Sequence, residues 1–555
     1  MLLSLAACGG GDASTARNPS ARVASQSPST AVTAKGMRRG VHGAETPPTA
    51  KRLTAGTASA ITLAAEEARR AQSTARLFAK SSGRRAVGFP RAIAETANAQ
   101  KTARRITWRA LPGGGQVGEL TIVSETAIAT RLGILVTRLP ERAMLRFFAP
   151  DDAQGYEVSG RQVLAAIRRN RDAGDLSDGG RTYWAPRVKG PKVTLEIELP
   201  PRVDAASVEV ALPSLSHVYD AIPTGLSGAC ELDVSCYPAY ADESDATARM
   251  NFVFEGYSYE CTGTLLNDKF ASGTPWLLSA NHCIPDQTTA STLQTDWFYR
   301  STGCDTEDLN PQYRTLWGGA TLLYAAGETD TAFMRLSEAP PPGAYFAAWS
   351  TEGLAFNLQV AALHHPVGDM QKISLGNVIG FRNCFQVADS DYFGCNDAPA
   401  DSSAFFTVTN YLGVVEPGSS GSAVYRSDGA SPPHRYVMGQ LYGSAASCYA
   451  RGASGTYGRF DVAYNAALHR WLSEPNAESD PNRLFNWAEV AYANFFAGVG
   501  MPGTQLGYTY RYYAATGNYL AVSNGRVVVH NGANWKFLDV GAVSDYMPLV
   551  TAAGF

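Results

Sequence analysis

The amino-acid sequence predicts a chain dominated by β-structure, with antiparallel β-barrels in its second half. Three observations support this fold class. Between Asn251 and Tyr464 short apolar runs such as NFVFEG, PWLLSA and AFMRL follow one another, separated by Gly, Pro, Asn and Asp, and such spacing is typical of strands joined by turns. Alternating apolar runs also lie between residues 106 and 213. Tight Gly-Asn and Asn-Gly turns separate further runs near the C-terminus.

The length of 555 residues is too great for one hydrophobic core, so several domains are expected. The predicted order is a lipoprotein-type signal remnant at 1–8, a basic tether at 9–105, a β-rich domain at 106–224, a barrel domain at 225–475 and a small β-module at 476–555. A run without periodicity between Ser216 and Gly225 suits a cleavage linker. Within the tether, Gly9 to Ala58 lacks large apolar residues and is expected to be disordered, whereas Ala58 to Lys80 predicts one short helix.

The net charge of −3 conceals a division along the chain. Met1 to Ala110 carries 18 Lys plus Arg against 5 Asp plus Glu, and the remainder carries 29 against 45. We interpret the basic part as a segment that lies against the acidic body before it is removed, which predicts salt-sensitive inhibition by the separated leader. Because no basic patch has interleaved aromatic residues, the sequence does not favour a nucleic-acid partner.

The first residues indicate export. Leu5-Ala6-Ala7-Cys8 resembles the lipobox of a bacterial lipoprotein, in which Cys8 would become a lipidated N-terminus. The preceding apolar stretch is short and lacks a positive charge, so an ordinary apolar N-terminus with a free thiol at Cys8 is the alternative. No other stretch approaches the 18 or more apolar residues that predict a membrane-spanning helix.

Three motifs together predict nucleophilic catalysis. Gly418-Ser419-Ser420-Gly421-Ser422 has the form of a nucleophile loop with Ser420 as the candidate nucleophile. A serine hydroxyl needs a base within hydrogen-bond reach and donors for the oxyanion that its attack creates. His282 ends the apolar run LLSANHC, and Asp330 precedes the apolar run TAFMRL. The chain order His282, Asp330, Ser420 is that of the chymotrypsin type of triad.

Nine cysteines give an odd count, which Cys8 explains if it is lipidated. The other eight can pair with one another, and paired thiols imply an oxidising compartment. None of them shows the CxxC spacing of a zinc site, so no metal and no other cofactor is expected.

From Gly225 to about Leu472 the chain resembles the lysyl endopeptidases, bacterial secreted members of the trypsin-like serine protease clan. GLSGACELDVSC at the start is similar to the beginning of their mature enzyme, and CTGTLLN, SANHC, ALHHP, EPGSSGSAVY, GQLYG and TYGRF follow in the order found in the family. The segment before Gly225 resembles the propeptide of the family only loosely, and the last 75 or so residues do not match its peptidase.

The resemblance implies two six-stranded barrels with a closing helix at Val462 to Leu472. It also implies an oxyanion hole formed by the amides of Gly418 and Ser420, and cleavage near Thr224-Gly225. Maturation in the family is autocatalytic after lysine, so Thr224 implies either a changed specificity or another protease. The implied disulfides are Cys230 with Cys448, Cys236 with Cys304, and Cys261 with Cys283, which leaves Cys384 with Cys395. His364-His365-Pro366 recurs in the family, and we interpret both histidines as hydrogen-bonded structural residues.

The specificity pocket departs from the family. The aspartate that pairs with substrate lysine is replaced by Gly455, and the Trp and His that line the cleft are replaced by Phe346 and Tyr442, with Gly443 beside them. A buried ammonium without a counter-charge is strongly disfavoured. Glu416 is shared with the family and could restore some cationic preference. We nevertheless expect that lysine specificity is lost in favour of an apolar or small residue.

The sequence therefore predicts an exported serine endopeptidase made as a zymogen, a monomer that acts on proteins or peptides and binds its own propeptide. It would be periplasmic or held at the outer membrane through Cys8, with release of the mature peptidase as a further expectation. The alternative is a catalytically idle lipoprotein whose barrel is a scaffold and whose C-terminal module binds a surface.

Overall fold

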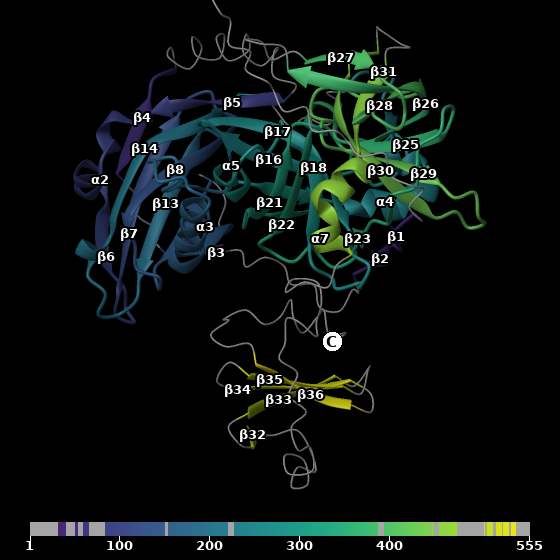
Figure 1. Ribbon diagram of the computed structural model, residues 1–555. Helices are drawn as coiled ribbons and strands as arrows, with labels where there is room; N and C mark the ends of the chain where they lie inside the picture. Colours follow the sequence, from purple (N-terminus) through teal and green to yellow (C-terminus); the bar gives the residue numbers. More distant parts are fainter. Residues whose placement is uncertain are drawn as a thin grey trace, which may run out of the picture. The chain divides into compact units, whose positions relative to one another are not determined.

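The computed structural model describes residues 31–39, 50–53, 59–65, 84–149, 154–219, 227–386, 393–444, 446–448 and 454–473, together with the backbone of five strands between 504 and 539. Strands predominate in these residues, and helices are few and short (Figure 1). We call residues 59–219 the N-terminal domain and residues 227–473 the barrel domain.

Seven strands form the first half of the barrel domain, and each pairs antiparallel with its neighbours in the order β20-β19-β16-β17-β18-β22-β21. Their bounds are Arg314–Leu316 (β20), Gln294–Trp297 (β19), Thr247–Phe254 (β16), Tyr257–Leu266 (β17), Trp276–Ala280 (β18), Thr331–Leu336 (β22) and Ala320–Ala326 (β21). Their large apolar side chains meet in one core that includes Phe252, Leu277, Trp297 and Met334.

Six strands form the second half, in the order β29-β25-β26-β28-β31-β30, and β30 pairs again with β29 to close the ring. Their bounds are Ala423–Ser427 (β29), Gln359–His364 (β25), Lys372–Gln386 (β26), Phe405–Leu412 (β28), Ser454–Arg459 (β31) and Arg435–Ser444 (β30). The predicted β-barrel fold is thus confirmed, but the first half has seven strands where the family resemblance implies six. A further strand, β27 (Phe393–Asp397), extends β26 as a hairpin.

A helix follows the last barrel strand, as predicted. It consists of α6 (Phe460–Ala463), a π-helical turn (Tyr464–Leu468) and α7 (His469–Leu472). Phe460, Tyr464, Leu468 and Leu472 recur at helical spacing and are buried against a core that also contains Trp349. Burial of this apolar stripe stabilises a helix that would be too short to persist alone.

Four disulfides join the three pairs that the family resemblance implies and the one pair that was left over. They are Cys230–Cys448, Cys236–Cys304, Cys261–Cys283 and Cys384–Cys395. The first joins the start of the barrel domain to the segment after β30, and the last lies within the β26–β27 hairpin. Four bridges in one domain are typical of proteins that fold in an oxidising compartment.

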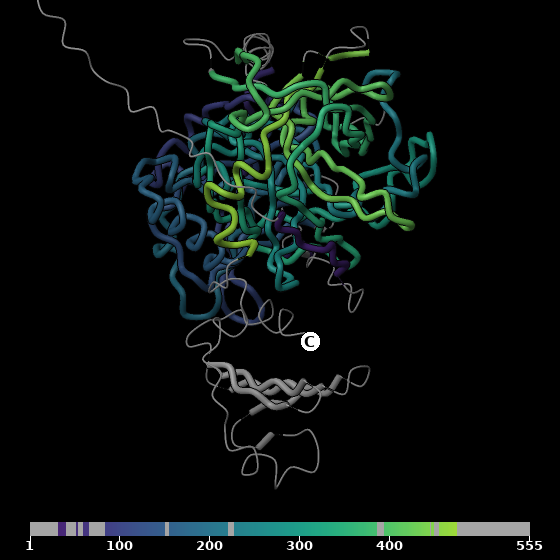
Figure 2. The backbone as a smooth tube through the Cα atoms, turned by 45° about the vertical axis from the view of Figure 1, so that its right-hand side comes forward, coloured from purple at the N-terminus to yellow at the C-terminus, as the bar shows by residue number. Residues whose placement is uncertain are grey.

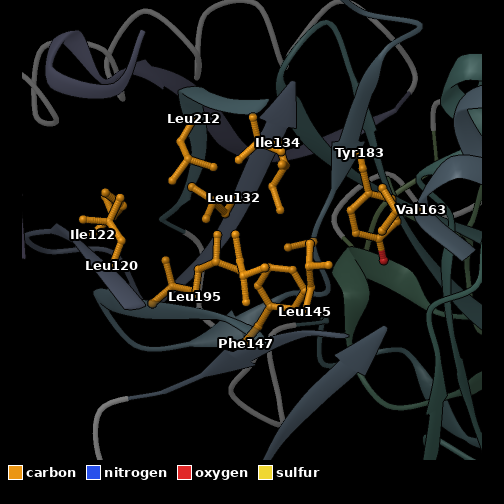
Figure 3. Close-up of a cluster of buried hydrophobic side chains, with 14 of the residues drawn as sticks. Leu120, Ile122, Leu132, Ile134, Leu145, Phe147, Val163, Tyr183, Leu195 and Leu212 are labelled. Atoms are coloured by element: carbon orange, nitrogen blue, oxygen red, sulfur yellow. The ribbon is translucent and has the colours of Figure 1, made fainter. Parts of the chain in front are cut away.

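The N-terminal domain packs two sheets around a core of aliphatic and aromatic side chains (Figure 3). Its main strands are β4 (Ala60–Leu63), β5 (Arg85–Ala92), β6 (Thr107–Ala110), β7 (Gln116–Ser124), β8 (Ala129–Arg138), β9 (Met144–Phe148), β10 (Gln154–Ser159), β13 (Lys192–Leu199) and β14 (Glu209–Val218). Helix α2 (Ala99–Arg105) and helix α3 (Gly160–Asp172) accompany them. The Ser159 and Gln162 side chains form a capping box at the start of α3.

The sequence-based boundary of this domain at residue 106 is wrong. Strand β4 pairs with β7, and strand β5 pairs with β14, so that both belong to its sheets. Residues 60–63 form a strand instead of the expected helix, Ala65 is helical, and residues 66–80 lie outside the described part. The expected disorder of residues 9–58 is contradicted for residues 31–39, where Thr33–Ala34 (β1) and Met37–Arg38 (β2) pair with the barrel domain, and for the short strand at Ala50–Lys51 (β3).

Strand β5 joins the two domains. It pairs on one side with β14 and on the other with β17 of the barrel domain, so that one twelve-stranded sheet runs through both. Side chains of opposite charge meet at this junction, since Glu260 of β17 accepts hydrogen bonds from Arg85 at 2.9 Å and from Arg187 at 3.1 Å. The charge division in the sequence therefore has a local counterpart at the interface.

The C-terminal strands form an antiparallel meander in chain order, with bounds Thr504–Gln505 (β32), Tyr508–Tyr513 (β33), Asn518–Ser523 (β34), Arg526–Asn531 (β35) and Asn534–Asp539 (β36). They occupy the part of the chain where alternating runs predict a β-module. Residues 474–503, which precede these strands, lie outside the described residues. Across the described residues, no helix has the length and apolar character needed to cross a bilayer.

Candidate active site

Two adjacent strands bring His282 and Asp330 together. His282 follows β18, and Asp330 precedes β22, which pairs with β18 in the register Ala280 to Thr331. The Asn281 N–H donates to the Asp330 carbonyl at 2.9 Å, which continues this pairing by one bond. Sheet register therefore makes neighbours of His282 and Asp330, which lie 48 positions apart in sequence.

The Asp330 carboxylate holds His282 at two points. Its Oδ1 accepts the backbone N–H of His282 at 2.8 Å, and its Oδ2 lies 2.8 Å from Nδ1 of the imidazole. The Asp330 side chain is buried, whereas His282 keeps 15% of its side chain exposed. An imidazole oriented in this way has its Nδ1–H bonded to the acid and its Nε2 available for proton transfer.

The turn that carries Asp330 is held from the other half of the barrel domain. Gln440 of β30 is fully buried and donates from Nε2 to the Thr329 carbonyl at 2.8 Å and to Thr331 Oγ1 at 2.9 Å. A Cβ at Gly458 would overlap the Thr329 carbonyl, so only glycine permits this approach. Asp330 itself has a φ of +50°, and these contacts stabilise that conformation. Sequence reasoning missed Gln440, although it lies in the motif GQLYG.

The loop that carries Ser420 packs onto the strand that leads to His282. Thr262 of β17 fixes this loop, since its N–H donates to the Ser420 carbonyl at 2.8 Å and its Oγ1 donates to the Gly418 carbonyl at 3.0 Å. Gly421 has a φ of +82°, and a Cβ there would lie 2.8 Å from the Ala280 amide. Glycine is required by both conformation and space, and the loop therefore lies against the end of β18, two residues before His282.

Gly418 shows the second left-handed conformation of this loop, with a φ of +99°. A Cβ there would lie 3.0 Å from the His365 carbonyl, so this glycine also makes a close approach. Such turns are the means by which consecutive amides are directed at one point to bind an anion. The Ser420 side chain itself is almost fully buried in this arrangement.

His364 and His365 lie beneath the loop as buried, hydrogen-bonded residues, as expected. His364 Nδ1 lies 2.9 Å from Ser419 Oγ, and His365 Nδ1 lies 3.0 Å from the Asp369 carbonyl. Burial lowers the pKa of each imidazole to about 3. Both rings are therefore neutral at physiological pH and act as structural supports.

The donor chemistry excludes a thiolate metal site here. Cys261, Cys283 and His282 approach one another closely, as do Cys236, Cys304 and Asp305. In each group of the described residues the two cysteines are joined in a disulfide, and a disulfide sulfur offers no thiolate to a metal.

Gly455 lies in β31, and its surroundings are apolar. A Cβ at this position would meet Tyr457 Cε2 at 3.1 Å, and Leu441 Cδ1 and Val415 Cγ2 at 3.4 Å each. All three neighbours belong to the buried core of the second half of the barrel domain. A side chain added at Gly455 would therefore point among apolar groups, with a small shift of the Tyr457 ring.

Tyr442 stands beside the catalytic candidate, but its partner is not the one expected. Its ring centroid lies 5.9 Å from that of His282, and it stacks on Phe393 at 4.0 Å. The assignment of Phe346 to the cleft is wrong, because Phe346 is buried in the core of the first half and pairs with Met37 of β2. Phe393 begins β27, and Gly443 lies directly beneath its ring, which a Cβ would meet at 2.7 Å.

Glu416 does not point to a free specificity pocket. Its Oε2 accepts the backbone N–H of Gly228 at 2.9 Å, and it therefore holds the first described residues of the barrel domain. The suggested recovery of cationic preference through Glu416 is not supported by this contact. Asp369 binds the same segment, since the Ser227 hydroxyl donates to its Oδ2 at 2.7 Å.

Comparison with known proteins gives matches over both domains. The family model described as "Lysyl endopeptidase, C-terminal domain" matches residues 224–458, and "Lysyl endopeptidase N-terminal domain" matches residues 59–219. A lysyl endopeptidase of Pseudomonas aeruginosa is 31% identical over 411 residues, which cover 70% of this chain and 82% of that protein. The start of the second match at residue 59 agrees with the inclusion of β4 and β5 in the N-terminal domain.

Two solved structures show weaker similarity. The Rv3671c protease from M. tuberculosis H37Rv is 13% identical and covers 46% of this chain and all of its own, with a TM-score of 0.28. The MamO protease domain from Magnetospirillum magneticum is 10% identical and covers 41% of this chain and 98% of its own, also with a TM-score of 0.28. TM-scores of this size do not bear on function.

Proposed function

Because this chain belongs to the lysyl endopeptidase family, we propose that it is an exported serine endopeptidase made as a zymogen, with His282, Asp330 and Ser420 as its catalytic residues. The observation that carries this proposal is that the Asp330 carboxylate binds His282 twice: Oδ1 accepts the backbone N–H at 2.8 Å, and Oδ2 lies 2.8 Å from Nδ1. A carboxylate that binds both the backbone and Nδ1 of one histidine fixes its tautomer and its orientation, which is what a general base requires.

In the proposed mechanism Ser420 Oγ attacks the carbonyl carbon of the scissile peptide bond, and Nε2 of His282 accepts the hydroxyl proton. The tetrahedral intermediate places its negative charge at the amides of Gly418 and Ser420, each worth about 10²- to 10³-fold in rate. His282 then protonates the leaving amine, and Asp330 stabilises the imidazolium throughout. Water then attacks the acyl carbon and gives its proton to His282, the bond to Ser420 Oγ breaks, and His282 returns the proton to Ser420 as the carboxylic acid product leaves.

The N-terminal domain is the proposed propeptide. Its support is the continuous sheet through β5 and β17, and the family match at residues 59–219. The proposed cut near Thr224-Gly225 lies outside the described residues. Export, a lipid anchor at Cys8 and a monomeric state remain parts of the proposal, and the four disulfides support export.

Hydrolysis of a denatured protein mixture by the processed chain tests this function. We expect Ser420→Ala to reduce cleavage by about 10⁴-fold or more, since catalytic triads lose activity as a unit. Ser422→Ala is the matched control, because its hydroxyl lies in the same loop and is buried without a hydrogen-bond partner among the described residues. If the unaltered and Ser420→Ala proteins cleave at the same rate, the cleavage does not come from Ser420, and the alternative of a catalytically idle barrel is favoured.

For specificity we propose that lysine is not preferred and that an apolar or small residue precedes the cleaved bond. The support is the apolar contact set around Gly455, formed by Tyr457, Leu441 and Val415. The three atoms nearest to a Cβ at Gly455 are carbons, so an ammonium group placed there would lose its hydration with no carboxylate among these nearest atoms.

Gly455→Asp is expected to create cleavage after lysine, with kcat/KM for a lysine substrate raised at least about tenfold. The reason is that a buried charge without its partner costs about 3–5 kcal/mol, whereas a tenfold change in rate corresponds to about 1.4 kcal/mol. Cut-site profiling by mass spectrometry measures the change. Gly455→Asn is the matched control, since it has the same shape without the charge and is expected to give no gain. If both variants cleave as the unaltered enzyme does, Gly455 does not face the substrate.

A further inference from the structure

Residues 31–39, which we call the strap, bind the barrel domain as added strands. Within it, β1 pairs antiparallel with Trp349–Ser350 (β24), and β2 pairs antiparallel with Tyr345–Phe346 (β23). In Figures 1 and 2 the strap lies along the barrel domain and apart from the strands of the N-terminal domain. The strap is therefore a part of the leader whose binding partner is the barrel domain itself.

Backbone hydrogen bonds continue beyond the two short pairings. Thr351 N–H donates to the Val32 carbonyl at 2.9 Å, and Gly343 N–H donates to the Arg39 carbonyl at 3.3 Å. In return Arg39 N–H donates to the Ala344 carbonyl at 2.8 Å. The strap is thus held at both ends by main-chain bonds, which is the manner in which an extended peptide is recognised at a strand edge.

Side chains add shape selectivity. Ala34 is only 4% exposed and is part of the same core as Trp349, and Met37 packs against the core of the first half. Gly36 lies between them, directly against the Tyr345 ring, and a Cβ there would overlap the Tyr345 hydroxyl. A larger residue at this position would force the Tyr345 ring to move, so glycine allows the strap to pack closely on this surface.

Charge complements the strap at its C-terminal end. Arg38 forms ion pairs with Asp242 and, at 2.5 Å, with Asp245, and its guanidinium also donates to the Gly343 carbonyl at 2.8 Å. Both carboxylates lie on helix α4 (Ala241–Ala246). The Arg38 side chain is 41% exposed, so salt is expected to weaken these pairs.

We infer that the strap retains the leader on the mature peptidase after the chain is cut between the two domains. The strap contacts the connection between the barrel halves at 343–351 and helix α4, which carry none of the three proposed catalytic residues. Binding at this surface therefore leaves the catalytic residues unoccupied by the strap, and the peptidase can remain joined to the N-terminal segment. The inference rests on the proposed function only in assuming the cut.

A designed cut separates this inference from the proposed function. A recognition sequence for a site-specific protease is inserted between residues 220 and 226 of the full chain, in a Ser420→Ala background, so that cutting does not depend on the chain's own activity. After the cut, the rate at which the leader dissociates from the immobilised peptidase is measured at several salt concentrations. Arg38→Glu and Gly36→Val are each expected to raise this rate at least about tenfold. The first places a negative charge beside the carboxylates of α4, and the second places a side chain against the Tyr345 ring.

Arg138→Glu is the matched control, since Arg138 forms an exposed ion pair with Glu209 inside the N-terminal domain and is expected to change the rate less than about twofold. Hydrogen exchange provides a second measurement, on the protein with an unaltered strap. It follows the barrel-domain amides that donate to carbonyls of the strap. The Thr351 and Gly343 amides are expected to remain protected after the cut. Loss of this protection on cutting, or dissociation unchanged in both strap variants, would overturn the inference.

Discussion

Asp330→Asn is expected to lower kcat for peptide hydrolysis by about 10⁴-fold, the size associated with replacing the acid of such a triad by its amide. The reason lies in the two-point hold on His282. The carboxylate offers one oxygen to the backbone N–H and one to Nδ1, both at 2.8 Å. An amide keeps only one oxygen, so with that oxygen on the backbone its NH₂ group faces Nδ1. The imidazole must then carry its proton on Nε2, where it cannot accept one from Ser420.

Steady-state kinetics on a peptide substrate measure this effect, and KM is expected to stay within a few-fold because Asp330 is buried away from the substrate. Asp397→Asn is the matched control, since Asp397 forms only an exposed ion pair with Arg382 at 3.2 Å. A variant with kcat within tenfold of the unaltered enzyme would remove Asp330 from the mechanism.

Glu260→Ala is expected to destabilise the uncut chain by about 3–5 kcal/mol, the cost of removing one member of a buried ion pair. Glu260 is 2% exposed and accepts hydrogen bonds from Arg85 and Arg187, which both belong to the N-terminal domain. Its loss leaves the guanidinium groups of Arg85 and Arg187 without this carboxylate at a largely buried junction. In a barrel domain separated from its leader, Glu260 faces solvent instead, so the same change should cost that form far less.

Urea unfolding of the uncut chain, and of the barrel domain separated from its leader, measures the free energy of unfolding that Glu260→Ala costs in each form. Glu209→Ala is the matched control, because it removes an exposed pair with Arg138, and exposed pairs contribute about 0–1 kcal/mol. Equal destabilisation of the two forms would contradict the assignment of Glu260 to the interface with the leader.

The strands and the triad candidates could be predicted because their signals are local. An apolar run marks a strand from the sequence alone. One such run ends just before His282, another begins just after Asp330, and a third follows the loop that carries Ser420. Sheet register then determines which strand ends meet, and the family resemblance supplied that register. Gln440 and Thr262 act through tertiary contacts to these turns, and no local pattern marks a buried Gln or Thr as a support.

The failures have physical causes as well. The helix expected at 58–80 does not include Ala60–Leu63, because pairing with β7 makes these residues a strand, while residues 66–80 lie outside the described part. The strap has strands of two residues, too short for any periodicity, and its order comes from the surface that it binds. The stacking that pairs Phe393 with Tyr442 exists only in the folded chain, so no local pattern marks Phe393 as the neighbour of Tyr442.

Labelling of the processed protein with a fluorophosphonate probe tests the central claim most directly, because the probe bonds only to a serine that an adjacent base activates. We predict one adduct per chain, located by peptide mass spectrometry on Ser420 and absent from the Ser420→Ala and Asp330→Asn proteins under the same conditions. An unlabelled protein that is fully folded and processed, or an adduct on another serine, would contradict the account.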